Sequence, residues 1–134
     1  LLDANDFCFN QLLGQGSFAQ IYSALHIPTN QVVAIKQIDL MQIHLKNETR
    51  QIIHELEFLR QIRSLNKFDF TPMFFGYYQT HSTLNIVLEL CHSNLTTFIS
   101  QRQLSQQEQI FICLQALIAV EKMHLSGFGH RDVK

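Results

Sequence analysis

The sequence lacks a surplus of charge of either sign. Lysine and arginine together number 10 and aspartate and glutamate number 11, which gives a formal net charge of -1 at pH 7. Domains that bind nucleic acid normally concentrate a basic surplus on one face. We therefore expect no nucleic-acid partner for this chain.

Cysteine is scarce, and its spacing suggests no disulfide or metal site. The three cysteines, Cys8, Cys91 and Cys113, are odd in number and far apart, and no two of them form a C-x-x-C pair. This pattern predicts reduced thiols in an intracellular, cytoplasmic protein. The seven histidines also lie outside H-E-x-x-H or any other ligand spacing, so we assign no residue to a metal.

Long apolar runs are missing as well. The most apolar stretch, Ile110–Val120, is shorter than the roughly 20 residues that a membrane-spanning helix needs. No basic stretch followed by an apolar core opens the chain, so we expect no secretion signal, although the start at Leu1 leaves an upstream segment open. With 46% hydrophobic and 16% charged residues, the composition is that of a folded domain.

Alternating apolar and polar residues predict a series of strands. The first strand leads into a glycine turn and contains Phe7, Phe9, Leu12 and Leu13. Further strands are predicted over 19–25, 32–38, 73–79 and 84–90, with turns at 28–30 and 80–83. Because the links between the first three strands are short, we expect an antiparallel meander.

Two helices are predicted. The first covers 47–65, where apolar residues recur at steps of three and four: Ile52, Leu56, Leu59 and Ile62. At the second, Ser105 and Glu108 fit a capping box, and the helix is expected to run to about Ser126, with Gly127 as a left-handed cap.

Apolar residues surround the second helix on every side. They are Ile110, Phe111, Ile112, Cys113, Leu114, Leu117, Ile118 and Val120. A helix that is apolar all round has to be enclosed by other elements. The sequence ends at Lys134 without such elements, so we expect a fragment of a larger domain.

A glycine-rich segment, Gly14-Gln15-Gly16-Ser17-Phe18-Ala19-Gln20-Ile21, joins the first two strands. Glycines let backbone amides approach phosphate oxygens without a side chain in the way. Alone, the pattern fits a glycine-rich hairpin turn equally well. A dinucleotide-binding fingerprint with Asp39 as its acid fails, because it needs a helix after the glycines, and a strand and Pro28 follow instead.

Lys36 ends the apolar run Val33-Ala34-Ile35-Lys36. A lysine in a buried strand is costly unless a carboxylate neutralises it, whereas at a sheet edge its long stem reaches water. On the predicted helix over 47–65, Glu55 falls inside the apolar stripe and Glu57 falls on the solvent side. Glu55 is therefore the predicted partner of Lys36.

The run His130-Arg131-Asp132-Val133-Lys134 follows Gly127-Phe128-Gly129. Positive charges beside Asp132 favour its ionised form. Taken alone, this run is better explained as a solvated charge cluster.

Together, in this order and spacing, these motifs and the segment Ile86-Val87-Leu88-Glu89-Leu90-Cys91 resemble the eukaryotic protein kinase family over essentially the whole chain. The resemblance implies an α+β, protein-kinase-like fold. Its parts would be a five-stranded antiparallel N-lobe sheet with one long helix, at about 1–90, a hinge at 91–94, and the first helices of a truncated, mostly helical C-lobe at 95–134.

The resemblance also implies an ATP site. Its residues would be Leu13, Gly14, Gln15, Gly16, Ser17, Phe18, Ala19, Ile21, Ala34, Lys36, Leu88, Glu89, Cys91 and Asn94. The loop would cover the phosphates with Phe18 at its tip, and Lys36, oriented by Glu55, would hold the α- and β-phosphates.

The remaining contacts would hold the adenosine. The adenine would lie between Leu13, Ile21 and Ala34, with Leu88 as the gatekeeper. The backbone of Glu89 and Cys91 would bind the adenine edge. Asn94 stands where many relatives have an acid for the ribose, so that contact is expected to be weaker or differently made.

The catalytic residues that the resemblance implies are Lys36, Glu55, Asp132 and Lys134. Asp132 would orient the substrate hydroxyl. Lys134 resembles the lysine that serine/threonine kinases direct at the γ-phosphate, and Arg131 resembles the arginine that pairs with a phosphorylated activation loop. We expect an ATP- and Mg²⁺-dependent serine/threonine kinase that acts on a protein. The metal ligands are expected beyond residue 134, so the fragment itself is expected to be inactive.

Two positions depart from the family pattern. Ala19 replaces the third loop glycine, and Gly129 stands where a β-branched or aromatic residue is usual. Neither change removes a catalytic group. The alternative is a pseudokinase, a nucleotide-binding or scaffolding module of the same fold. A nucleotide-binding domain of another fold is disfavoured by the order of the motifs.

Overall fold

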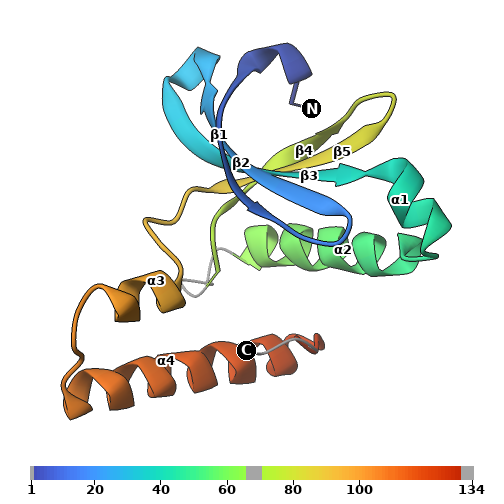
Figure 1. Ribbon diagram of the computed structural model, residues 1–134. Helices are drawn as coiled ribbons and strands as arrows, with labels where there is room; N and C mark the ends of the chain where they lie inside the picture. The colour runs from blue at the N-terminus through green and yellow to red at the C-terminus, as the bar shows by residue number, and fades with distance from the viewer. Residues whose placement is uncertain (1, 66–70, 131–134) are drawn as a thin grey trace. The chain divides into compact units, whose positions relative to one another are not determined.

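The computed structural model describes residues 2–65 and 71–130. The chain divides into two compact units, Leu1–Cys91 and His92–Lys134. Figure 1 follows the first unit from the blue N-terminal strands to the yellow ones, and the second through the orange and red helices.

The first unit is built on a five-stranded antiparallel sheet (Figure 1). Its strands are β1 (Phe7–Gln15), β2 (Ala19–His26), β3 (Gln31–Asp39), β4 (Phe74–Gln79) and β5 (Thr83–Glu89), in the spatial order β1-β2-β3-β5-β4. The meander of the first three strands and the five-stranded fold are confirmed. Between β2 and β3, Asn30 adopts a left-handed conformation with φ 55°, in the turn predicted at 28–30.

Two helices follow β3. α1 (Leu40–Leu45) was not predicted, because a helix of six residues is too short to show a periodic pattern. Asp39 caps it, since its Oδ1 accepts a hydrogen bond from the Gln42 amide at 3.0 Å. α2 (Thr49–Leu65) starts later than the predicted residue 47, because Asn47 has a left-handed φ of 58° and cannot continue a helix.

Apolar clusters cover both faces of the sheet. The cluster beneath α2 joins α1, α2 and the sheet and contains Ile38, Ile43, Ile52, Leu59, Phe74, Leu84 and Ile86. The cluster on the other face contains Phe7, Ala24, Val33, Ile35, Tyr78 and Val87. Phe7 and Tyr78 stack there with ring centroids 5.2 Å apart, and burial raises the pKa of the Tyr78 hydroxyl. Burial on both faces holds the central strand β3 firmly in place.

The second unit contains α3 (Leu95–Ser100), which was not predicted, and α4 (Gln106–Leu125). α4 begins with the predicted capping box at Ser105 and Glu108, and it ends before Gly127, whose φ of 82° suits the predicted left-handed cap. Its apolar residues are exposed on several sides, Phe111 at 62% and Leu117 at 66%. None of the helices in the described residues has both the length and the apolar character needed to cross a bilayer.

Candidate functional site

The side chains of Lys36 and Glu55 form an ion pair in the first unit. The Lys36 Nζ lies 2.6 Å from Glu55 Oε1 and 2.8 Å from Oε2, so the ammonium donates to both carboxylate oxygens. The two side chains are 24% and 30% exposed. The predicted partnership is therefore confirmed. Lys36 is neither a buried, unpaired charge nor a solvated edge residue.

The spacing of apolar residues on α2 places Glu55 opposite the strand. Ile52 and Leu59, three residues before and four after it, are buried at 4% and 9% against the sheet. This leaves Glu55 on the packed side of the helix, where a cation offsets the cost of partly removing its carboxylate from water. Glu57 lies on the exposed side, as predicted, with its carboxylate 3.5 Å from His54 Nδ1.

The register of the sheet brings several predicted site residues to the face that carries Lys36. Ile21 lies opposite Lys36 on β2, and Ala34 lies opposite Leu88 on β5. Since alternate residues of a strand share a face, Ala34 and Lys36 are on the same side of β3. Ile21 is 40% exposed, so an apolar surface beside the ion pair is open to a ligand.

Gly14, near the end of β1, and Gly16, in the turn before β2, both have room for a side chain. A Cβ added at Gly14 would meet nothing within 4 Å, and one added at Gly16 would make only an ordinary contact of 3.6 Å with the Ala19 carbonyl oxygen. Neither residue is among those with a positive φ. Gly76 differs, because its φ is 153° and a Cβ would lie 3.1 Å from Leu2. The space over Gly14 and Gly16 is thus free for a group from outside.

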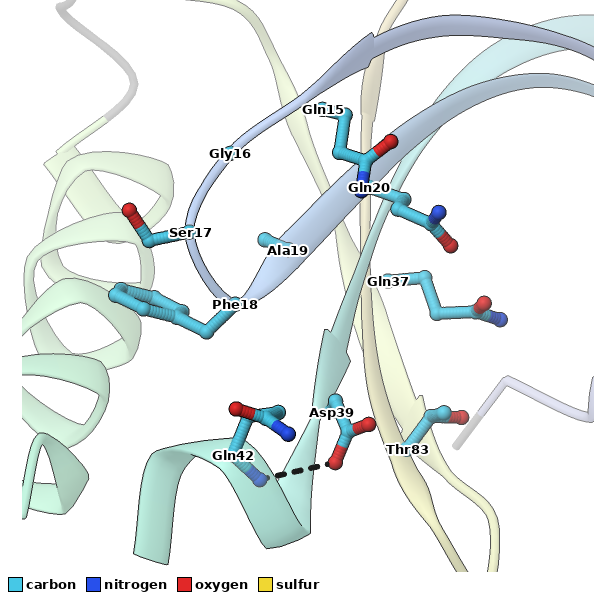
Figure 2. Close-up of a pocket in the computed structure, with 10 residues that line it drawn as sticks. All are labelled: Gln15, Gly16, Ser17, Phe18, Ala19, Gln20, Gln37, Asp39, Gln42 and Thr83. Carbon is cyan, nitrogen blue, oxygen red and sulfur yellow. Dashed lines mark hydrogen bonds between the residues drawn. The ribbon is translucent and has the colours of Figure 1, made fainter. Parts of the chain in front are cut away.

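The tip of the loop is folded as a tight hairpin. The Gly16 amide donates to the Ala19 carbonyl at 2.7 Å, and the Asp39 amide donates to the Phe18 carbonyl at 3.1 Å. Phe18 packs against the cluster beneath α2, and Figure 2 shows its ring directed away from Gln20 and Gln37. The loop is therefore anchored to the structure that carries Glu55.

A cavity of about 330 Å³ lies at the loop tip (Figure 2). Its walls include the amide side chains of Gln20 and Gln37, which are opposite each other on β2 and β3. Because neighbouring residues of a strand point to opposite faces, this wall lies on the face away from Lys36. The cavity and the ion pair are therefore on different sides of the sheet.

Other predicted site residues have structural contacts of their own. The Glu89 carboxylate accepts a hydrogen bond from the Met73 amide at 3.0 Å, and the Glu89 amide donates to the Met73 carbonyl at 2.8 Å. Cys91 is an exposed free thiol. Asn94 caps α3, since its Oδ1 accepts from the Thr97 amide at 2.8 Å. These contacts do not use the backbone carbonyls of Glu89 and Cys91 or the side-chain amide nitrogen of Asn94.

Part of the predicted site lies outside the described residues, namely Arg131, Asp132 and Lys134. In the part of the chain that the structure describes, no group of three or more histidine, cysteine, aspartate or glutamate residues is placed to hold a metal ion.

Sequence reasoning missed one contact of the loop. The Lys46 ammonium, at the C-terminal end of α1, donates to the Ser17 carbonyl at 2.9 Å. The two residues are far apart in the sequence, and Lys46 belongs to no motif. No sequence signal could have paired them.

Comparison with known proteins gives one family and several relatives. The model described as "Protein kinase domain" matches residues 7–134. The chain is 30% identical over 131 residues to the serine/threonine-protein kinase pakG of Dictyostelium discoideum, covering 96% of this chain and 10% of that protein. It is 31% identical over 124 residues to the serine/threonine-protein kinase Tao of Drosophila melanogaster, covering 91% of this chain and 12% of that protein. The chain thus spans about a tenth of the length of these relatives.

Among solved structures, the chain resembles the crystal structure of Rad53 1-466 in complex with AMP-PNP. The TM-score is 0.82 at 24% sequence identity, and the match covers 96% of this chain and 34% of that one. At this identity the similarity concerns the fold, which is the one expected from the sequence.

Proposed function

This chain belongs to the protein kinase family, and on that premise we propose that it is the nucleotide-binding part of an ATP-dependent serine/threonine kinase. The observation that carries the proposal is the ion pair of Lys36 and Glu55 on the sheet face shared with Ile21 and Ala34. This arrangement combines a fixed positive charge, an open apolar surface and a glycine loop. A nucleotide needs this combination, because its base is apolar and its phosphates are anionic.

The glycine loop supports the placement of the phosphates. The room over Gly14 and Gly16 admits phosphate oxygens, and no described residue accepts a hydrogen bond from the amides of Ser17 and Phe18. Unpaired backbone amides at a glycine turn are good donors to anions. In the proposed complex, Gly14–Ala19 cover the triphosphate, and Lys36 holds its α- and β-phosphates.

The adenosine is assigned to the residues between the loop and the end of β5. Leu13, Ile21, Ala34 and Leu88 are proposed to contact the adenine. The backbone of Glu89 and Cys91 is proposed to bind its edge, and Asn94 to lie near the ribose. The Glu89 side chain is engaged with Met73, which leaves its backbone carbonyl for this role.

The proposed reaction transfers the γ-phosphoryl group of ATP to a serine or threonine hydroxyl of a protein. The bond between the γ-phosphorus and its bridging oxygen breaks, a bond to the hydroxyl oxygen forms, and ADP and the hydroxyl proton leave. Asp132 is assigned to orient that hydroxyl and Lys134 to contact the γ-phosphate. Alignment of the two reacting groups supplies most of the acceleration in such transfers.

Bound Mg²⁺ would neutralise phosphate charge, and we assign no described residue as its ligand. The preference for serine and threonine is supported by Lys134 and by the similarity to the serine/threonine-protein kinases pakG and Tao. We also propose that 1–90 is the N-lobe, 91–94 the hinge and 95–134 the start of the C-lobe.

The unpaired thiols Cys8, Cys91 and Cys113 are consistent with an intracellular, cytoplasmic protein.

The test uses the complete protein that contains this chain. Wild type and Lys36→Met are compared for transfer of labelled phosphate from ATP to a serine- and threonine-containing protein, and for thermal stability. We expect Lys36→Met to lose transfer and to keep a cooperative melting transition. Methionine matches the lysine stem in length but has no charge. Full turnover in Lys36→Met would refute the proposed role of Lys36. A wild type that binds ATP without transferring phosphate would instead indicate a pseudokinase.

A further inference from the structure

Both ends of α1 hold the tip of the glycine loop. At its start, the Asp39 amide donates to the Phe18 carbonyl at 3.1 Å. At its end, the Lys46 ammonium donates to the Ser17 carbonyl at 2.9 Å. Two consecutive carbonyls of the loop therefore point at one short helix.

These contacts fix the direction of the loop amides. The described peptide bonds are all trans, and in a trans peptide the carbonyl and the following N–H point in opposite directions. With the Ser17 carbonyl directed at Lys46, the Phe18 N–H points away from α1. No described residue accepts a hydrogen bond from that N–H. The Lys46 contact thus keeps a free donor exposed at the loop tip.

The same helix is firmly joined to α2. Ile43 of α1 is 4% exposed and packs in one cluster with Ile52 of α2, and Phe18 packs against that cluster. The Glu48 amide, just before α2, donates to the Ile43 carbonyl at 3.0 Å. A side chain on α1 that binds the loop therefore connects it to the helix that carries Glu55.

We infer that Lys46 is a positioning residue that orients the Ser17–Phe18 peptide toward the nucleotide phosphates and ties the loop to the Glu55 helix. The inference rests on the proposed function for its effect on ATP, although the tether itself does not require ATP. Lys46 is exposed, so the contact is of the size of a surface charge interaction. Its loss is expected to release the loop without unfolding it.

The experiment compares three variants of the complete protein. Lys46→Ala removes the donor, Lys46→Arg keeps a cation that can reach the carbonyl, and Arg50→Ala removes another exposed cation, from the first turn of α2. The first measurement, without nucleotide, is hydrogen exchange of the Asp39 amide, whose acceptor is the loop carbonyl of Phe18. The second is the KM for ATP and kcat.

We expect Lys46→Ala to speed exchange at Asp39 about three- to fivefold and to raise the KM for ATP by a similar factor, with kcat within about twofold. Lys46→Arg and Arg50→Ala should resemble wild type in both measurements. Unchanged exchange in Lys46→Ala would overturn the inference, and so would an equal effect of Arg50→Ala. If exchange rises in Lys46→Ala alone while wild type shows no ATP-dependent transfer, the tether stands and the proposed function fails.

Discussion

The Lys36 ammonium lies within 2.8 Å of both carboxylate oxygens of Glu55, so one strand residue and one helix residue fix each other's position. Because β3 is buried on both faces, the strand end of this pair has little freedom. The position of α2 therefore decides whether the pair forms. Any change that shifts α2 relative to the sheet is expected to act on the ammonium of Lys36.

The first prediction concerns the charge of Glu55. In Glu55→Gln, the neutral amide cannot balance the ammonium, so Lys36 is expected to leave its present orientation. We expect kcat/KM for phosphate transfer to fall by about tenfold or more, as for loss of a hydrogen bond to a charged group. The matched control is Glu57→Gln on the exposed side of the same helix, with an expected change within about twofold. Equal losses in both variants would contradict the role of the ion pair.

The second prediction compares the effects of two glycine-to-alanine substitutions on ATP affinity and on folding stability. Gly14→Ala places a Cβ where nothing lies within 4 Å, so the free energy of unfolding should change by less than about 0.5 kcal/mol. The same Cβ enters the space proposed for the phosphates, and the Kd for ATP should rise roughly fivefold or more, from a clash of about 1 kcal/mol.

The control for Gly14→Ala is Gly76→Ala. Gly76 has a φ of 153°, and its added Cβ would lie 3.1 Å from Leu2. This variant should lose about 1–3 kcal/mol of folding free energy while its Kd for ATP stays near that of wild type. Calorimetry measures both quantities. Unchanged ATP affinity in Gly14→Ala would show that the space over the loop is not used by a nucleotide.

Sequence patterns predicted those parts of the molecule that repeat or that bury a charge. Alternating residues gave the strands, and the place of Glu55 in an apolar stripe was enough to pair it with Lys36. The short helices α1 and α3 were missed, because six residues show no periodic pattern. Their N-caps, Asp39 and Asn94, were also interpreted as ligand contacts. Asp39 was weighed as a dinucleotide ligand and Asn94 as a ribose contact. Both side chains also cap helices, and because the Asn94 cap uses only Oδ1, the ribose contact of Asn94 stays a prediction.

Contacts between an exposed side chain and a distant backbone group were also beyond prediction. Lys46 and Ser17 meet only because α1 turns the chain back beside the loop, and Lys46 belongs to no motif that could pair it with the loop. The Glu89 carboxylate holds the Met73 amide for a similar reason, since β4 and β5 meet there. Such contacts depend on the tertiary arrangement, which local patterns do not encode.

The third prediction concerns Asn85, a polar residue that is fully buried on β5. Its Oδ1 accepts from Gln37 Nε2 at 3.1 Å, and its Nδ2 donates to Thr83 Oγ1 at 2.9 Å. Asn85→Ala removes both hydrogen bonds and leaves a void, which should cost about 2 kcal/mol of folding free energy. Chemical denaturation of the complete protein measures this. Gln79→Ala, at an exposed position on β4, should change stability by less than about 0.5 kcal/mol. If Asn85→Ala has the same free energy of unfolding as wild type, the buried hydrogen bonds contribute nothing to stability.

The fourth prediction concerns the pH dependence of the cap at the start of α4. Hydrogen bonds from the backbone amide and then the hydroxyl of Ser105 favour the charged carboxylate, so the pKa of Glu108 lies below its ordinary value of 4.5. A carboxyl group whose pKa is lowered by folding contributes stability above its unfolded pKa and loses it as the pH falls through the folded pKa. The cap should therefore be complete at neutral pH and weaken below 4.5.

Carboxyl NMR of the complete protein follows this titration directly. In Ser105→Ala, the pKa of Glu108 is expected to move back toward 4.5, because the hydroxyl no longer donates and the cap geometry is lost. Glu108→Gln keeps a side chain that can accept from the Ser105 amide but cannot titrate. The protection of the first α4 amides should then become independent of pH in the acidic range. If those amides lose protection on acidification in Glu108→Gln as they do in wild type, another group controls the end of the helix.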